Sequence, residues 1–424
     1  MSMKIIGINE IGGFRLGNAE NKEKGTGCTV IICEDGAVGG VDVRGGGPAT
    51  RETDLLRSEN TVNAVNAVVL SGGSAFGLEA ASGVMRELAD RKIGFDVGEG
   101  IVVPIVCGAS LFDLAVGDHG AFPDVGMGIQ AVRNAYEHDG FRNGNHGAGT
   151  GATVGKILGH DRAMKTGLGT FACGDDFLEV GAIAAVNAVG DIYNGPGNII
   201  AGLRSEDGSS IYGTIKTLKG MVHDEAGFVD DSTTFIDRSE IEEAISFTED
   251  DDSFVPAEEE TAAADAPEAE VLPDEVPEIL SDDAQERQPE ELPEILSDEE
   301  PEGVIDEQPE AEAEEEPKPE LTAAELGYDI AFNTTISCLI TNADLTKSQA
   351  NKLASILHDA YARAIKPVHG TLDGDTVFVL ATGEQKVNFD AFAALATDVM
   401  QYAIIDGAVS AKGAYGLPAA RDMQ

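Results

Sequence analysis

One stretch of this chain cannot contribute to a folded core, and it limits the fold more than any other feature. Residues 249–320 hold 31 acidic and 2 basic residues, many prolines and almost no aromatic residues. Such a composition buries too little apolar surface to offset the entropy lost on folding. It predicts a disordered insertion over 246–321, so the fold must be built from 1–245 and 322–424 together.

The insertion contains a short repeat. Pro-Glu-Ile-Leu-Ser-Asp occurs at 277–282 and again at 293–298. The two copies are either a docking motif for a basic groove or the by-product of a drifting duplication, and we favour the duplication.

The charge of the chain bears on which partners it can bind. The formal net charge is −48, of which about −19 remains on the two folded pieces. This balance argues against nucleic acid as a partner, because the phosphate backbone would be repelled. It is compatible with cationic substrates, including peptides with a free α-ammonium group.

The sequence predicts a cytoplasmic protein without a membrane partner. No apolar run approaches the roughly 20 residues that span a bilayer, and the N-terminus lacks the pattern of a secretory signal. The five cysteines are scattered without a CxxC pair, which indicates reduced core thiols. Cys338 has no cationic neighbour in the sequence that would activate it.

The seven histidines show no metal-ligand spacing, so we expect neither a metal nor another cofactor. His369 lies near an acidic turn, where a capping or surface role is favoured over a catalytic one.

Local patterns predict alternating strands and helices. Strands are expected at 29–33 and 37–43, joined as a hairpin by Glu34-Asp35-Gly36. Further strands are expected at 66–70, within 92–106 (broken by 100–104), at 335–341 and at 377–381. Helices are expected at 78–90, from the N-cap Thr346 to about Ile365, and at 390–406. This pattern suggests a layered α/β sandwich.

The pair Asn333-Thr334 stands at the head of the buried strand expected at 335–341. If the bond between them is cut, Thr334 becomes an N-terminal residue whose α-amine can serve as base for its own hydroxyl. The alternative is a β-branched strand residue that is present for packing.

Glycine-rich segments invite other interpretations, which fail on spacing. Gly147 to Lys156 is not a phosphate-binding P-loop, because Thr150 replaces its first glycine and Ile157 follows the lysine. Ser74 does not lie in a GxSxG nucleophile motif. Dense glycines more often mark close backbone approach or peptide N–H groups turned toward an oxyanion. Ser71, Gly72 and Gly73 therefore either form a structural turn or line a substrate pocket.

Three polar side chains have a catalytic alternative to a structural one. Asp373 and Asp375 form either a plain β-turn or a carboxylate pair that orients the amine or hydroxyl of Thr334. Asn187 is either a helix-end amide or a donor to a tetrahedral oxyanion.

Taken together, these segments resemble the L-aminopeptidase/D-esterase family, which includes β-peptidyl aminopeptidases. The matching stretches keep their order along the chain and are residues 44–52, 70–78, 147–152, 333–336, 367–369 and 373–378. The resemblance implies a four-layer αββα sandwich related to ornithine acetyltransferases, a precursor that cleaves itself, and homo-oligomers such as a tetramer of processed heterodimers.

The resemblance also implies roles for single residues. Asn333-Thr334 is the autoprocessing bond, Thr334 the nucleophile and Asn187 the oxyanion-side amide, while Asp373 and Asp375 match a Ser-x-Glu/Asp pair. Phe112 stands where some members place a tyrosine that helps to bind the oxyanion, and a phenyl ring cannot donate that bond.

The sequence thus predicts an autoprocessed aminopeptidase or amidase that acts on short peptides, amides or esters through an acyl-enzyme on Thr334. Two alternatives stay open. One is an acyltransferase of the ornithine acetyltransferase type, and the other is an unprocessed, non-enzymatic scaffold that acts through its acidic repeats.

Overall fold

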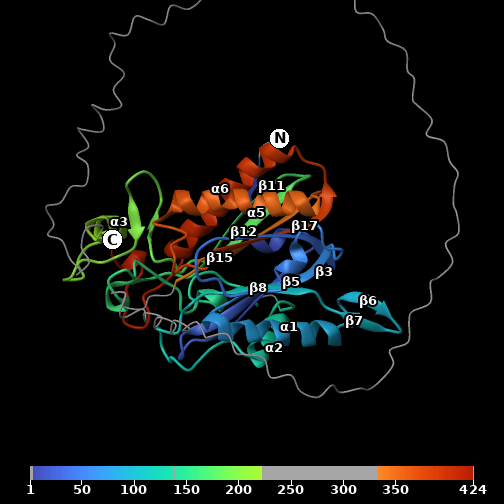
Figure 1. Ribbon diagram of the computed structural model, residues 1–424, viewed down its shortest axis with the longest axis horizontal. Coiled ribbons are helices and arrows are strands. Elements are labelled where there is room, and N and C mark those ends of the chain that lie inside the picture. Colours follow the sequence, from blue (N-terminus) through green and yellow to red (C-terminus); the bar gives the residue numbers. More distant parts are fainter. Residues whose placement is uncertain (1–2, 138, 222–332, 424) are drawn as a thin grey trace, which may run out of the picture. The chain divides into compact units, whose positions relative to one another are not determined.

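The two pieces of the chain on either side of the acidic stretch share one sheet (Figure 1). The computed structural model describes residues 3–137, 139–221 and 333–423. The expected insertion at 246–321 and both of its hexapeptide copies lie outside the described residues. Within the described part, β15 (Ile336–Ala343) and β17 (Thr376–Gln385) of the second piece lie between β12 (Glu179–Ala185) and β3 (Thr26–Val43) of the first.

The large sheet has ten strands in the order β1-β11-β12-β15-β17-β3-β5-β8-β4, with β2 paired to β3. The pairs β15–β17 and β5–β8 are parallel, and the other pairs are antiparallel. The other strands of this sheet are β1 (Lys4–Ile5), β2 (Arg15–Asn21), β4 (Thr50–Arg51), β5 (Ala64–Ser71), β8 (Val106–Ser110) and β11 (Leu168–Gly174). Smaller sheets are formed by β6 (Phe95–Gly98) with β7 (Ile101–Val103), by β9 (Thr153–Val154) with β10 (Met164–Lys165), and by β13 (Asp191–Tyr193) with β14 (Ile199–Ala201) and β16 (Ile365–Lys366).

The hairpin expected at Glu34-Asp35-Gly36 is wrong. β3 runs through these residues as one strand of 18 residues, and its register with β5 shifts between Ile32 and Ala37. The turn-forming residues are accommodated as a β-bulge, with Gly36 at a φ of 81°. As a result, β3 pairs with β2 through its first half and with β17 through its second half.

The strand break expected at 100–104 is also misplaced. The turn falls at Glu99 and Gly100, whose φ angles of 56° and 77° suit a tight hairpin turn, and Ile101–Val103 is itself a strand.

The long helices lie on two sides of the strands (Figure 1). α5 and α6 pack on β3, β17, β11 and β12, whereas α1 and α2 pack on β2, β3, β5 and β8. Their bounds are α1 (Glu79–Asp90), α2 (Val125–Asn134), α5 (Lys347–Ala364) and α6 (Phe389–Val409), with a short α3 at Thr214–Gly220. The expected N-cap is confirmed, because the Thr346 hydroxyl accepts from the Gln349 N–H and the Gln349 side chain completes a capping box.

The buried apolar residues fall into three clusters. One lies under α5 and α6, one lies under α1 and α2, and the third is lined mainly by strand residues. β15 shows why two clusters meet at one strand. Ile336, Cys338 and Ile340 belong to the strand-lined cluster, whereas Leu339 belongs to the cluster under α5 and α6, since successive side chains of a strand point to opposite faces.

Among the described helices, α6 alone is long and apolar enough to cross a membrane by length and composition. Its apolar residues, including Phe392, Met400 and Ile404, are buried against the strands. Core packing accounts for this composition.

Candidate active site

Strand register places Thr334 at the centre of the candidate site. β15 and β17 run parallel with Ile336 opposite Thr376, so the residues that precede them also lie side by side. The Gly374 N–H donates a 2.9 Å hydrogen bond to Oγ1 of Thr334. The turn before β17 therefore contacts the threonine hydroxyl through its backbone.

The backbone at Thr334 is strained. Thr334 is 4% exposed and has a φ of 118°, a region that a β-branched residue rarely adopts. Such conformations cost about 1–3 kcal/mol, and they persist where the surrounding structure enforces them. Here the Asn333 N–H donates to the Leu372 carbonyl and the Thr335 N–H donates to Asp375, so the residues on both sides of Thr334 are held.

Asn187 lies opposite Thr334 for a similar reason. β12 is antiparallel to β15 with Ala185 paired to Ile336, so Asn187, two residues past the end of β12, comes beside the residues before β15. It follows a strand, which rules out the helix-end alternative. Its backbone N–H donates to Oγ1 of Thr335 at 3.3 Å, and its Nδ2 donates to the Phe112 carbonyl at 2.9 Å.

Phe112 contributes its backbone to the site. It follows β8, and its N–H donates a 3.4 Å hydrogen bond to the carbonyl oxygen of Asn333. This oxygen belongs to the peptide bond between Asn333 and Thr334. A donor for that carbonyl is thus present without the tyrosine hydroxyl that Phe112 lacks.

Asp373 is a buried carboxyl group that is 1% exposed. Burial and the nearby charge of Asp375 raise the pKa of Asp373 to about 7. The charge of Lys156 and the hydrogen bond from the Gly370 amide lower this pKa, but by less. Oδ2 accepts from the Gly370 N–H at 2.9 Å, and Oδ1 is buried without a hydrogen-bond partner among the described residues. A carboxyl group in this state can exchange a proton near neutral pH.

Both carboxylate oxygens of Asp375 accept hydrogen bonds. Oδ1 accepts from the Thr335 N–H at 2.7 Å, and Oδ2 accepts from the backbone N–H of His369 at 3.2 Å and from its Nδ1 at 2.8 Å. His369 is thereby part of the site, whereas the sequence favoured a capping or surface role.

Lys156 is a functional candidate that sequence reasoning missed. Its Nζ donates to the backbone oxygen and to Oδ1 of Asn187, at 3.0 and 2.8 Å. Burial lowers the pKa of Lys156 to about 7, while the charges of Asp373, Asp113 and Asp375 oppose this shift. The sequence feature that could have identified it is a lysine in an apolar, glycine-rich stretch, because a lysine that is buried there needs a polar partner.

Ser71, Gly72 and Gly73 lie next to this site but do not face open space, since all three are buried. The Ser71 hydroxyl bonds the carbonyls of Gly72 and Gly77 and the Ser110 hydroxyl, and the Gly73 N–H donates to Oδ1 of Asp113 at 2.6 Å. Asp113 follows Phe112 directly. The segment thus supports the Phe112 backbone from behind.

The glycines of residues 147–155 are confirmed as points of close backbone approach. A Cβ on Gly149 would lie 2.0 Å from the Leu168 nitrogen, and one on Gly151 would lie 2.2 Å from the Gly25 oxygen. These contacts let the loop pack against β11 and carry Lys156 to Asn187.

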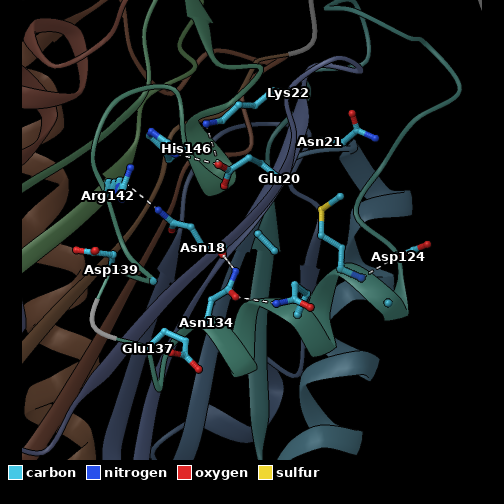
Figure 2. A pocket seen from close by; sticks show the side chains of 15 residues that line it. Asn18, Glu20, Asn21, Lys22, Asp124, Asn134, Glu137, Asp139, Arg142 and His146 are labelled. Carbon is cyan, nitrogen blue, oxygen red and sulfur yellow. Dashed lines mark hydrogen bonds and ion pairs between the residues drawn. The ribbon is translucent and has the colours of Figure 1, made fainter.

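A separate polar pocket of about 670 Å³ lies beside α2 (Figure 2). Its polar side chains are largely bonded to one another or to nearby backbone, as in His146 to Glu20 at 2.9 Å and Asn134 to the Asn18 carbonyl at 2.6 Å. None of its lining residues is among the site residues above.

The described residues contain no group of three or more His, Cys, Asp or Glu side chains that could hold a metal ion. Cys338 is buried, and burial raises the pKa of its thiol far above the usual range. It is therefore a core thiol.

The sequence profile of Peptidase family S58 matches residues 7–235 and 260–419. An uncharacterized aminopeptidase of Mycobacterium leprae is 30% identical, over 99% of this chain and 94% of the relative. One of Mycobacterium tuberculosis is 29% identical, over 98% and 97%. A 6-aminohexanoate-oligomer endohydrolase of Kocuria sp. is 24% identical, over 93% and 84%.

Solved structures show the same fold. The L-aminopeptidase D-Ala-esterase/amidase of Ochrobactrum anthropi, described as a variant of the Ntn hydrolase fold, has a TM-score of 0.53 at 15% identity and covers 96% of this chain and 86% of its own. A β-aminopeptidase of Burkholderia sp. has a TM-score of 0.50 at 15% identity, covering 97% and 89%.

Proposed function

This chain belongs to peptidase family S58, and from this premise we propose that it is an autoprocessed aminopeptidase or amidase with Thr334 as its nucleophile. The proposal rests on the surroundings of the Thr334 hydroxyl group. It is buried, held by the Gly374 N–H, and attached to a strained backbone next to a carbonyl that already accepts a hydrogen bond.

The first reaction is cleavage of the chain at Asn333–Thr334. The Thr334 oxygen attacks the Asn333 carbonyl carbon, the carbon–nitrogen bond breaks, and the threonine nitrogen takes up a proton. Water then hydrolyses the resulting ester and frees both ends. The Phe112 N–H supports this step because it donates to the oxygen on which negative charge develops, and relief of the strain at Thr334 favours it.

Proton transfer in this first step requires a group other than the α-amine, which is still part of the peptide bond. Asp373 and Lys156 both have a pKa of about 7 and lie in the site. Groups with such pKa values are suited to taking up and returning a proton at neutral pH.

The second reaction is turnover of substrate. The free α-amine of Thr334, with an ordinary pKa near 8, takes the proton of the hydroxyl as that oxygen attacks the first carbonyl of a short peptide, amide or ester. Asn187 and backbone N–H groups bind the oxyanion, and water releases the acyl group. Amide hydrolysis agrees with the name of the Kocuria relative.

Asp373 is the better of the two carboxylates for binding the substrate's ammonium group. Both oxygens of Asp375 accept hydrogen bonds from Thr335 and His369, whereas Oδ1 of Asp373 makes no well-formed hydrogen bond with the described residues, and the carboxyl group has only a further backbone contact at Val189. An unpaired buried oxygen is costly, and a cationic donor from the substrate would remove that cost.

The wider architecture forms part of the same proposal. Three separate apolar clusters support a four-layer αββα arrangement, in which two halves of the ten-stranded sheet face each other in the middle. Cytoplasmic location and homo-oligomeric assembly complete it.

Mass analysis and N-terminal sequencing of freshly purified protein test the proposal. We expect two fragments, the smaller one beginning at Thr334, and hydrolysis of aminoacyl anilides by the cleaved form. Thr334→Ala should remain one chain of 44.2 kDa without activity, and Thr334→Ser should still be cleaved. Full activity of an intact chain would refute the proposal. Product analysis with and without an added amine separates hydrolysis from acyl transfer.

A further inference from the structure

Lys165 is a fully buried lysine that the proposed reaction does not yet use. It lies in β10, opposite Thr153 of β9. Its Nζ donates three hydrogen bonds to backbone carbonyl oxygens, those of Gly149 and Ala152 at 3.0 Å each and that of Thr166. An ammonium group has three N–H donors, so this carbonyl cradle uses every donor that the charged lysine has.

The surroundings of Lys165 also bear on its charge. Burial lowers the pKa of Lys165 to about 7, the charge of Asp113 opposes this shift, and the charge of Lys156 adds to it. A buried charge is costly unless it is hydrogen-bonded and paired. Three carbonyl oxygens and a nearby carboxylate meet this requirement, so the lysine can persist inside the protein as an ammonium group.

One of the three carbonyls leads directly to Asn187. The Ala152 oxygen accepts from Lys165 and from the Thr166 N–H at 3.1 Å. The N–H of the same peptide group belongs to Thr153, and it donates to Oδ1 of Asn187 at 3.0 Å. A cation at the oxygen of an amide polarises the group and makes its N–H a stronger donor, since hydrogen bonds in a chain strengthen one another. A single peptide group therefore separates Lys165 from the Asn187 side chain.

The Thr166 carbonyl belongs to a segment that holds the backbone just before Asn187. The Thr166 hydroxyl donates to the Val186 carbonyl at 2.6 Å, and the Gly167 carbonyl accepts from the Val186 N–H at 3.1 Å. The cradle of Lys165 thus joins two pieces of chain, one bonded to the side chain of Asn187 and one bonded to the residue that precedes it.

We propose that Lys165 is a positioning residue of the oxyanion site, which keeps the Asn187 amide oriented through the Ala152–Thr153 peptide group without touching the substrate. Nδ2 of Asn187 has two hydrogens, of which one goes to the Phe112 carbonyl and the other serves the oxyanion. This inference rests on the proposed function, because it needs Asn187 to act on the oxyanion. Negative charge develops there only in the transition state, so Lys165 affects kcat more than KM.

Lys347 offers a matched control, because it has the same kind of carbonyl cradle elsewhere in the protein. It is the first residue of α5 and is buried. Its Nζ also donates to three backbone carbonyls, those of Leu55, Asn60 and Val62, at 2.8, 2.8 and 2.9 Å. Methionine at either position removes a buried ammonium group and three hydrogen bonds, but only the cradle of Lys165 leads to Asn187 within the described residues.

A double-mutant cycle on the processed enzyme tests the proposal, with kcat and KM measured separately on an aminoacyl anilide. Lys165→Met should lower kcat by about 10–100-fold and change KM by about twofold or less. In an Asn187→Ala background the same substitution should lower kcat by about threefold or less, because the amide through which it acts is gone. Lys347→Met should leave kcat within about twofold of its reference in both backgrounds.

The outcomes separate this inference from the proposed function. An equal loss of kcat in both backgrounds, or no loss in either, overturns the role of Lys165 while cleavage at Thr334 stands. A wild-type chain that stays uncut overturns the proposed function first. If Lys165→Met does not fold or is not cleaved, the nitrogen-15 signal of Lys165 Nζ in wild-type protein decides at about pH 6, below its pKa of about 7. Three slowly exchanging hydrogens support the cradle, and a freely exchanging amine overturns it.

Discussion

Lys156 donates hydrogen bonds to both oxygens of Asn187, at 3.0 Å to the backbone oxygen and at 2.8 Å to Oδ1. The side-chain amide therefore has its oxygen turned toward the lysine and its Nδ2 toward the Phe112 carbonyl. A buried cation thus sets the direction of the amide that is expected to act on the oxyanion.

Replacing Lys156 with methionine should slow formation of the Thr334 fragment by about 100-fold, because Asn187 keeps only the Thr153 N–H as a donor to Oδ1 and Asp373 loses a stabilising charge. The fraction of cleaved chain is followed by mass spectrometry. Lys352→Met, at an exposed position, is the control. Cleavage of the Lys156 variant at the control rate would contradict this role.

The Phe112 contact depends on the backbone and not on the ring. Phe112→Ala keeps the N–H and should be cleaved within about threefold of the wild-type rate. Phe112→Pro removes the donor to the Asn333 carbonyl and should be slower by about 100–1,000-fold. Thermal melting confirms that both variants fold, and equal cleavage rates would show that this N–H does not matter.

Asp373 should make stability depend on pH. The pKa of its carboxyl is raised from 3.8 to about 7 by burial and by Asp375, so between these values the folded state binds a proton that the unfolded state has lost. Its contribution to the free energy of unfolding falls as pH rises through this range.

Asp373→Asn removes this dependence. Its free energy of unfolding should exceed that of the wild type by an amount that grows from about pH 4 to about pH 8, up to a few kcal/mol. Urea denaturation across this range measures the difference. Asp359→Asn, at an exposed position, should show a flat difference, and a flat difference for Asp373→Asn would be inconsistent with the raised pKa.

Gly149→Ala should destabilise the fold by about 1–3 kcal/mol or more, because the new Cβ would lie 2.0 Å from the Leu168 nitrogen and backbone cannot move aside cheaply. Gly220→Ala, at the end of α3, meets nothing within 4 Å and should be neutral or mildly stabilising. Chemical denaturation of both variants checks the pair.

Local sequence predicted those elements whose causes are local. The N-cap at Thr346 and the helix that follows it are confirmed, because a capping box and a pattern of period 3.6 act within a few residues. The strand expected at 335–341 is confirmed within two residues, since a run of apolar residues that is buried on both faces needs no distant information.

The errors arose where distant pairing overrides local preference. Glu34-Asp35-Gly36 has the composition of a turn, yet β5 pairs with β3 on both sides of it and β17 pairs with the second half of β3, so the strand continues through it as a bulge. Lys156 was overlooked because its partner Asn187 lies 31 residues away, and the apolar, glycine-rich stretch around the lysine does not reveal which group it contacts.

By itself, the amino-acid order determined the strands that follow Thr335 and Asp375, the helices that follow Leu78, Thr346 and Asn388, and the close-packed glycine loop, and it singled out Asn333-Thr334 and the Asp373 turn. Only the tertiary structure decided that Gly374, Asn187, Phe112 and Lys156 gather around Thr334. The reason is that the register between β12, β15 and β17 is set by side chains packing on both faces of the sheet, and residues far apart in the chain become neighbours only through that register.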